Sequence, residues 1–186
     1  MKVSMKSKSD NKSGERKGGT SRRRFLKAVV AGGAGAILGL SLRPARILAT
    51  GHAEALLLSC MDYRLVDKTE NYMVKRGLKE KFDHIILPGA ALAVITDKYP
   101  DWNKTFWEEL KLSIDLHKIE KVILLDHRDC GAYKQILNED FAQKPAEETN
   151  IHTAQLNKLR DLIKEKYSKL EVEMLLMSLT GTVEKI

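Results

Sequence analysis

The chain has 186 residues and a mass of 21.0 kDa, with 43% hydrophobic residues and only 2 cysteines. This size predicts one globular domain with an added segment, and the cysteine count excludes a small protein stapled by disulfides. The net charge of +7 is unevenly placed, because residues 1–53 hold 12 Lys and Arg against 2 acidic residues, whereas residues 54–186 hold 20 against 23. The basic charge therefore belongs to the N-terminal segment, and no nucleic acid is expected as a partner.

The N-terminal segment, residues 1–53, is predicted to direct export. Ser21-Arg22-Arg23-Arg24-Phe25-Leu26-Lys27 precedes the apolar residues 28–42, and this order resembles a twin-arginine export signal. The apolar stretch has 15 residues, fewer than the roughly 18 that a membrane span needs. We therefore expect the twin-arginine export machinery as a partner, cleavage near Gly51-His52-Ala53, and a periplasmic or extracellular protein. If the leader is not cleaved, it would anchor the protein to the membrane.

From residue 54 onward, the domain alternates apolar runs with amphipathic stretches. Strands are predicted over residues 55–59, 84–87, 122–125 and 172–179, with a possible edge hairpin over 182–186. One helix is predicted from a cap at Asn103, with one face formed by Phe106, Leu110, Ile114 and His117. A second helix has its face formed by Leu156, Leu159, Ile163, Tyr167 and Leu170. This order predicts an α/β fold, a small and mostly parallel sheet flanked by helices, with residues 96–106 as a polar loop.

Both cysteines follow predicted strands. Cys60 comes directly after residues 55–59, and His127 and Cys130 come just after residues 122–125. Ligands of parallel sheets collect beyond the carboxyl ends of the strands, so these side chains are expected to converge if the two strands are neighbours. Two thiolates and one imidazole are three ligands that Zn²⁺ accepts, which leaves a fourth position for water or substrate. We therefore predict one zinc ion per subunit, held by Cys60, His127 and Cys130.

Two motifs carry a family resemblance over residues 55–186. Cys60-x-Asp62-x-Arg64, followed later by His127-x-x-Cys130-Gly131, resembles the β-class carbonic anhydrases. The resemblance implies the fold of that family, a homodimer or higher homo-oligomer, and zinc-dependent reversible hydration of CO2 to bicarbonate by a zinc-bound hydroxide. It also implies that Asp62 accepts a hydrogen bond from the zinc-bound water and that Arg64 holds Asp62 through a bidentate contact. A closed state, in which Arg64 releases Asp62 onto the metal until the pH rises, is a further hypothesis.

The chain also departs from the family pattern, which keeps alternatives open. Leu87-Pro88-Gly89-Ala90-Ala91 stands where the family usually carries a polar residue near the product site. No Gln is found for the position that many members supply to the pocket from an N-terminal element. The alternatives are a hydrolase of COS or CS2 on the same zinc site, a catalytically silent zinc-binding relative in which Asp62 fills the fourth position, and a thiol redox protein. The redox alternative is disfavoured because Cys60 and Cys130 come from different loops.

Several other polar residues are expected to have supporting or structural roles. Residues near the second motif are predicted to be solvated or to support the site without acting in catalysis: Asp126, Arg128 and Asp129. Histidines without ligand spacing are predicted to be surface or helix-end residues: His84, His117 and His152.

Overall fold

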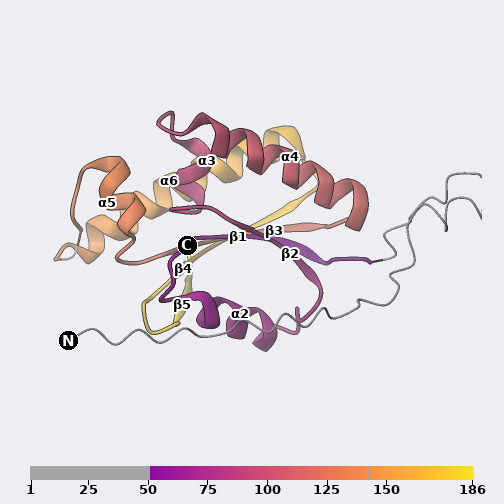
Figure 1. Ribbon diagram of the computed structural model, residues 1–186, viewed down its shortest axis with the longest axis horizontal. Helices are drawn as coiled ribbons and strands as arrows, with labels where there is room; N and C mark the ends of the chain where they lie inside the picture. The colour runs from indigo at the N-terminus through magenta and orange to yellow at the C-terminus, as the bar shows by residue number, and fades with distance from the viewer. Residues whose placement is uncertain (1–50, 142) are drawn as a thin grey trace, which may run out of the picture. The chain divides into compact units, whose positions relative to one another are not determined.

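The computed structural model describes residues 51–141 and 143–186, which form a five-stranded sheet with the strand order β2-β1-β3-β4-β5 (Figure 1). The strands are β1 (Ala55–Ser59), β2 (Phe82–Ile86), β3 (Lys121–His127), β4 (Glu171–Met177) and β5 (Val183–Lys185). Strand β1 pairs in parallel with both β2 and β3, β3 pairs in parallel with β4, and β5 is antiparallel to β4. The predicted parallel sheet and its C-terminal edge hairpin are therefore confirmed.

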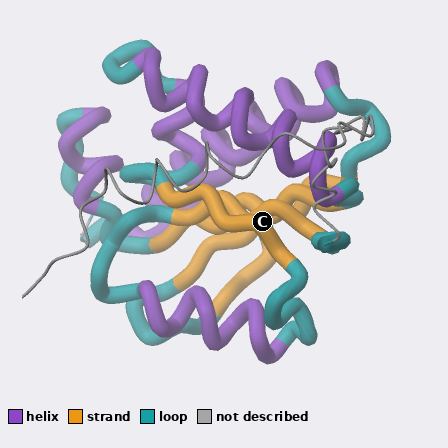
Figure 2. Tube along the Cα trace, turned by 45° about the vertical axis from the view of Figure 1, so that its right-hand side comes forward, coloured by secondary structure: helices purple, strands orange, loops and turns teal. Residues whose placement is uncertain are grey.

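Helices cover both faces of this sheet. They are α2 (Val66–Lys75), α3 (Ala91–Ile95), α4 (Pro100–His117), α5 (Gly131–Leu137) and α6 (Pro145–Lys166). Helix α2 lies alone on one face, and α3, α4 and α6 form a layer on the other (Figures 1 and 2). The α/β prediction is thus confirmed, because a parallel sheet needs crossover helices that shield it on both sides.

The central strands β1 and β3 are buried on both faces of the sheet, which explains why their sequences are continuous apolar runs. Side chains alternate between the two faces of a strand, so Leu56 and Leu58 pack in the core beneath α4 and α6. Leu57 belongs instead to the core on the α2 side. Both sets are almost fully buried, so neither face tolerates polar side chains at these positions.

Some predicted boundaries were wrong. Helix α4 begins at Pro100 with Tyr99 as its N-cap, so the predicted cap at Asn103 and most of the predicted loop over residues 96–106 are corrected. Proline suits the first helical position, because the missing N–H has no acceptor there and the ring fixes a helical φ. The Asn103 side chain instead donates a hydrogen bond to the carbonyl oxygen of Val94 at 2.6 Å. In the second predicted helix, Leu170 lies beyond the end of α6, immediately before β4.

The chain turns sharply between β2 and α3, at a position that bears on the functional site. Gly89 has a φ of 86° and Ala90 a φ of 41°, both in a region that disfavours residues with a Cβ atom. A Cβ atom on Gly89 would lie 3.2 Å from the Cβ atom of Ala132, so glycine is required there. Ala90 has no such freedom, and its conformation costs about 1–3 kcal/mol that surrounding contacts must offset.

The predicted export signal and its apolar stretch, residues 21–42, lie outside the described residues. Within residues 51–141 and 143–186, no helix is both long enough and apolar enough to cross a membrane.

Candidate metal centre

The two motifs meet because β1 and β3 are neighbours. Their parallel register pairs Ser59 with Leu125, so Cys60 leaves the sheet beside the end of β3, where His127 is the last strand residue. From β1 the chain crosses first to β2 on one side and then to β3 on the other side. The carboxyl ends of β1 and β3 therefore lie at a topological switch point. Such points are where open α/β sheets bind their ligands.

Cys60, His127 and Cys130 come together in a compact group of ligand atoms. One ligand atom from each residue lies within 4.8 Å of the others, and no other such group of three is found among the residues that the structure describes. The sulfur atoms of Cys60 and Cys130 are 3.8 Å apart. Two sulfurs bound at about 2.3 Å to one tetrahedral zinc ion lie about 3.8 Å apart. The spacing of the two thiols therefore fits a shared metal ion.

The hydrogen bonding of His127 leaves one ring nitrogen available to a metal. Its Nδ1 lies 2.8 Å from the carbonyl oxygen of Arg128, which can only accept, so Nδ1 donates. In the neutral ring, which is the form that binds metals, Nε2 is then the unprotonated nitrogen, and it is buried without a hydrogen-bond partner. A buried acceptor with no partner is unfavourable unless another group occupies it. A bound cation at Nε2 would satisfy it.

Each thiol changes the ionisation of the other. The pKa of Cys60 is lowered, chiefly by its hydrogen bond to Cys130 and further by His127 and by the backbone N–H of Gly89, although burial opposes the shift. The Gly89 N–H donates to the Cys60 sulfur at 3.3 Å. The pKa of Cys130 is raised by Cys60 and by burial. Cys60 is therefore the thiol that more readily supplies a thiolate.

Asp62 and Arg64 form a bidentate ion pair beside these ligand atoms. Arg64 donates from Nε to Asp62 Oδ1 at 2.9 Å and from Nη2 to Oδ2 at 2.7 Å. This pairing lowers the pKa of Asp62 to about 2, so the carboxylate stays ionised throughout the neutral range and acts only as an acceptor. Asp62 Oδ2 lies 3.9 Å from Nε2 of His127, which places the carboxylate at the edge of the ligand group.

Arg64 has a second partner that connects the two motif loops. Its Nη1 donates to Oδ2 of Asp129 at 2.8 Å, and its Nη2 donates to the Asp129 carbonyl oxygen at 2.9 Å. Asp129 has a φ of 56°, and its backbone N–H donates to Glu148 of α6 at 2.6 Å. The predicted supporting role of Asp129 thus takes a definite form, because Asp129 ties Arg64 to the turn between His127 and Cys130.

The prediction for His152 was wrong, because this residue is buried. Its side chain is 1% exposed and its Nδ1 lies 2.8 Å from Asp126 Oδ2. Asp126 is buried as well, so of the two roles predicted for it, a solvated residue or a supporting one, the solvated role is excluded. His152 precedes Leu156 by four residues, and Glu148 precedes His152 by four. This helical spacing continues the buried stripe of α6 and was the sequence signal for His152.

The other two histidines pair locally. His84 on β2 is exposed, and its Nε2 is 2.7 Å from the Ser59 hydroxyl. His117, at the end of α4 as predicted, has its Nδ1 2.8 Å from Oδ2 of Asp83. Neither belongs to the group of possible metal ligands.

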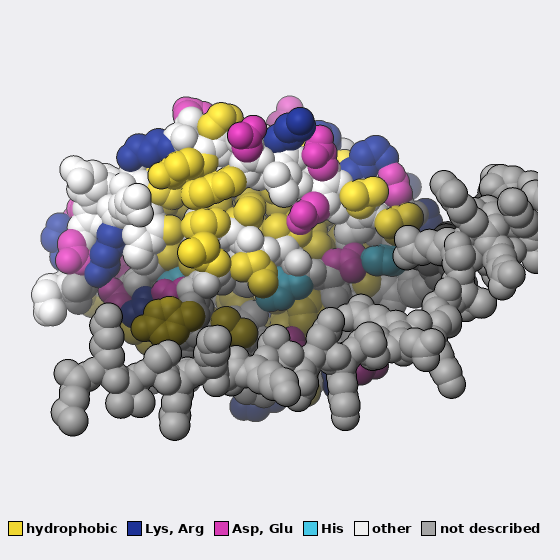
Figure 3. All heavy atoms as spheres, in the orientation of Figure 1, with side chains coloured by type: hydrophobic (Ala, Val, Ile, Leu, Met, Phe, Trp, Pro, Cys, Tyr) yellow, Lys and Arg dark blue, Asp and Glu magenta, His cyan; other side chains and the backbone are white. Residues whose placement is uncertain are grey.

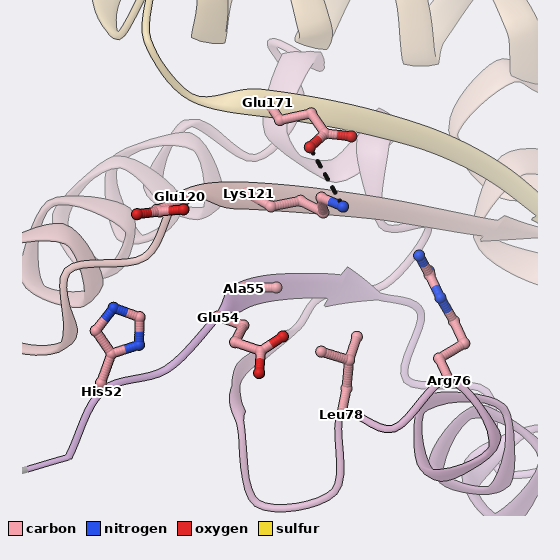
Figure 4. Close-up of a pocket in the computed structure, with 8 residues that line it drawn as sticks. All are labelled: His52, Glu54, Ala55, Arg76, Leu78, Glu120, Lys121 and Glu171. Carbon is pink, nitrogen blue, oxygen red and sulfur yellow. Dashed lines mark ion pairs between the residues drawn. The ribbon is translucent and has the colours of Figure 1, made fainter.

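A cavity of about 410 Å³ lies at the opposite end of the sheet. It is lined by Glu54, Lys121 and Glu171, near the amino ends of β1, β3 and β4, and by Arg76 after α2. Figure 4 shows the Lys121–Glu171 ion pair across it. Its acidic and basic side chains largely offset one another, and none of the possible metal ligands lines it. We therefore place the candidate site at the carboxyl ends of the strands.

Comparisons with known proteins agree with this architecture. A solved carbonic anhydrase from Streptococcus mutans has a TM-score of 0.50 and 17% identity, covering 88% of this chain and 96% of that chain. Uncharacterized proteins of Rickettsia bellii and Rickettsia conorii are each 46% identical over 134 residues, which cover 72% of this chain and 82% and 72% of theirs. The family described as "Putative carbonic anhydrase" matches residues 50–186. The chain therefore belongs to this carbonic anhydrase family.

Proposed function

We propose that the protein catalyses the zinc-dependent, reversible hydration of CO2 to bicarbonate. The observation that carries this proposal is the grouping of Cys60, His127 and Cys130 around one point, with the Asp62–Arg64 pair at its edge. These three ligands would hold one zinc ion per subunit. When bound, zinc supplies a water ligand acidic enough to ionise near neutral pH.

The residues of this chain would orient that chemistry. Asp62 is ionised and can only accept, so it would receive the hydrogen bond of the attacking group and fix its direction. Arg64 keeps the carboxylate in place through two parallel hydrogen bonds. Apolar side chains pack beside both thiols and would exclude water while admitting a small apolar gas: Leu92, Ile95, Trp102 and Ile136.

Stopped-flow CO2 hydration by the full chain tests the proposal. We expect zinc-loaded protein to hydrate CO2 at neutral and mildly alkaline pH, and a strong chelator to remove this activity until zinc is restored. A larger rate at alkaline pH, together with a change in the spectrum of the cobalt-substituted protein, would support the closed state of Asp62. Zinc-loaded protein without hydration at either pH would overturn the proposed reaction.

Replacing Asp129 by asparagine is expected to weaken the hold on Arg64. The pKa of Asp129 is lowered by Lys134 and by Arg64, so the wild-type side chain is a charged acceptor and the amide is a poorer one. Because Arg64 and Asp129 are both partly exposed, we expect only about a fivefold loss of kcat/KM for CO2, equivalent to roughly 1 kcal/mol. Lys134→Met removes the other partner of Asp129 and should leave the rate unchanged. An unchanged rate in Asp129→Asn would mean that Asp62 and the backbone carbonyl of residue 129 fix Arg64 without the Asp129 carboxylate.

A second candidate reaction is hydrolysis of COS or CS2 on the same site. The segment in which the family usually carries a polar residue favours this reaction. Its residues Leu87, Ala90 and Ala91 are buried and apolar, which suits a more apolar substrate than CO2. Parallel assays of CO2 and of both sulfur gases with the same zinc-loaded preparation separate the reactions. A zinc-loaded protein inactive on all three would instead favour the silent zinc-binding relative.

The redox alternative makes a prediction about metal removal. The two thiols are free and 3.8 Å apart, so the argument from different loops no longer disfavours it. In metal-free protein, we expect oxidised glutathione to take two electrons and two protons from Cys60 and Cys130, which form a disulfide while two glutathione thiols are released. Zinc should prevent this by occupying both sulfurs. Mass spectrometry and thiol counting measure the outcome, and two free thiols in the oxidised, metal-free chain would contradict it.

We also propose that the protein forms a homodimer or higher homo-oligomer. Strand β2 lies at the edge of the sheet, and Ile86, Leu112 and Leu116 on β2 and α4 expose about half of their side chains. Figure 3 shows hydrophobic side chains gathered on the helical side of the molecule. A second copy would cover such apolar surface beside an unprotected edge strand. Light scattering on the zinc-loaded chain tests this, and a monomer mass would refute it.

Export through the twin-arginine pathway is proposed from the motif at residues 21–27. Cell fractionation should find the wild-type chain outside the cytoplasm, or in the membrane fraction if the leader is retained. Lysine at both Arg22 and Arg23 should keep it in the cytoplasm. Equal export of both chains would exclude this route.

A further inference from the structure

A buried carboxyl group lies next to the three candidate metal ligands in the structure. Asp126 precedes His127 on β3 and is 1% exposed. Its Oδ1 accepts a hydrogen bond from the backbone N–H of Ala91 at 3.0 Å. Its Oδ2 accepts from the Tyr133 hydroxyl at 2.5 Å and lies 2.8 Å from Nδ1 of His152. Three groups from α3, α5 and α6 therefore satisfy one carboxyl group that water does not reach.

The bond to Ala91 fixes the turn that contacts Cys60. Ala91 is the first residue of α3, where the backbone N–H has no acceptor within the helix, and its N-cap, Ala90, provides no side-chain cap. Ala90 also has an unfavourable φ of 41°, so the turn needs a contact that holds it. Two residues before Ala91, the N–H of Gly89 donates to the Cys60 sulfur at 3.3 Å.

The bond to Tyr133 fixes the helix that follows the other thiol. The Tyr133 side chain is fully buried and its hydroxyl reaches Asp126. Tyr133 lies in the first turn of α5, the helix whose N-cap residue is Cys130. One carboxyl group is thus bonded on one oxygen to the turn that donates to Cys60, and on the other to the first turn of the helix that follows Cys130.

We propose that Asp126 is a positioning residue that fixes two elements beside the sulfur ligands: the turn whose Gly89 N–H donates to Cys60, and the first turn of α5, which follows Cys130. The inference rests on the proposed function in that both sulfurs bind the metal. An N–H donor draws charge from a thiolate, which weakens its donation to the metal and strengthens the metal as a Lewis acid. Asp126 therefore tunes the metal without contacting it, and His152 holds the carboxyl group from behind.

Cobalt substitution of the full chain tests this role. Asp126→Asn keeps the shape of the side chain but offers an N–H group where one of the donors now points. We expect the sulfur-to-cobalt charge-transfer band to move to lower energy, because the thiolate loses the N–H donor that draws charge from it. We also expect the zinc dissociation constant to rise about 10- to 100-fold, because the ligands lose the contacts that fix their positions. Leu159→Ala, a cavity variant in the core beneath α6, should lower the melting temperature and leave the band in place. An unmoved band in Asp126→Asn, or an equal shift in Leu159→Ala, would overturn the proposal.

A second measurement does not need Asp126→Asn to fold. In cadmium-113-loaded wild-type protein, the amide proton of Gly89 should show a coupling to the metal through the Cys60 sulfur. In Tyr133→Phe, this coupling should persist, because Ala91 still bonds Oδ1 of Asp126. A missing coupling in the wild type, or its loss in Tyr133→Phe, would refute the proposed role.

These readouts separate this inference from the proposed reaction. A wild-type chain that shows the expected spectra but does not hydrate CO2 would refute the reaction and leave the role of Asp126 intact. A chain that hydrates CO2 but whose spectra do not respond to Asp126→Asn would do the reverse.

Discussion

Replacing Cys60 by alanine is expected to abolish both zinc binding and CO2 hydration. The variant keeps only His127 and Cys130, which come from one turn, and it loses the thiol whose pKa the site lowers. Three protein ligands are the minimum usual for a catalytic zinc site, so two ligands should not retain the ion through dialysis. Metal content by atomic absorption and hydration by stopped flow, both on the full chain, measure the two losses.

The neighbouring residue supplies a matched control for Cys60→Ala. Met61 is 62% exposed, so Met61→Ala should retain one zinc ion per chain. Circular dichroism of the metal-free variant, compared with metal-free wild type, shows whether Cys60→Ala still folds. A folded Cys60→Ala chain that keeps a full equivalent of zinc would rule out Cys60 as a ligand.

Replacing Asp62 by asparagine is expected to lower kcat/KM for CO2 on the order of 100-fold while zinc stays bound. The amide cannot act as the charged acceptor that the wild-type residue provides, and it places N–H donors toward Arg64. Losses of this size are typical when a positioned acid–base group is removed. Because Asp62 is not among the three ligands, zinc content should equal that of wild type. The combination of full zinc and low activity distinguishes this variant from Cys60→Ala.

Asp67→Asn is the control for this change, because Asp67 is an exposed carboxylate in the first turn of α2. It makes the same chemical substitution and should leave hydration unchanged. Wild-type rates in Asp62→Asn would show that the Asp62–Arg64 ion pair is structural and has no part in CO2 hydration. Loss of zinc from Asp62→Asn would instead support Asp62 as a fourth ligand.

The departure from the family pattern at Leu87 to Ala91 gains a physical interpretation from the fold. These residues form the turn into α3, in which Gly89 and Ala90 have positive φ and the backbone reaches both Cys60 and Asp126. The segment therefore acts through its backbone N–H groups. A polar side chain is not needed for either contact, although its absence leaves the neighbouring wall apolar.

The sequence by itself determined the α/β class, the positions of the strands and the candidate ligand residues. Continuous apolar runs such as residues 55–59 predict strands buried on both faces, and the residues after them include the chain's two cysteines. Local signals were weaker for helix ends. Asn103 looked like a cap, but Pro100 three residues earlier suited the first helical position better, and the amide of Asn103 found an acceptor in Val94.

Only the tertiary structure decided which polar groups meet. The sequence gives no indication that Asp129 bonds Arg64, since 65 residues separate them, or that Asp126 lies against Tyr133 and His152. Such contacts depend on strand order, because β1 and β3 are adjacent only after the chain has crossed to β2 and back. Residue spacing reports neighbours along one helix or strand, whereas the placement of a buried carboxyl group depends on donors from several elements at once.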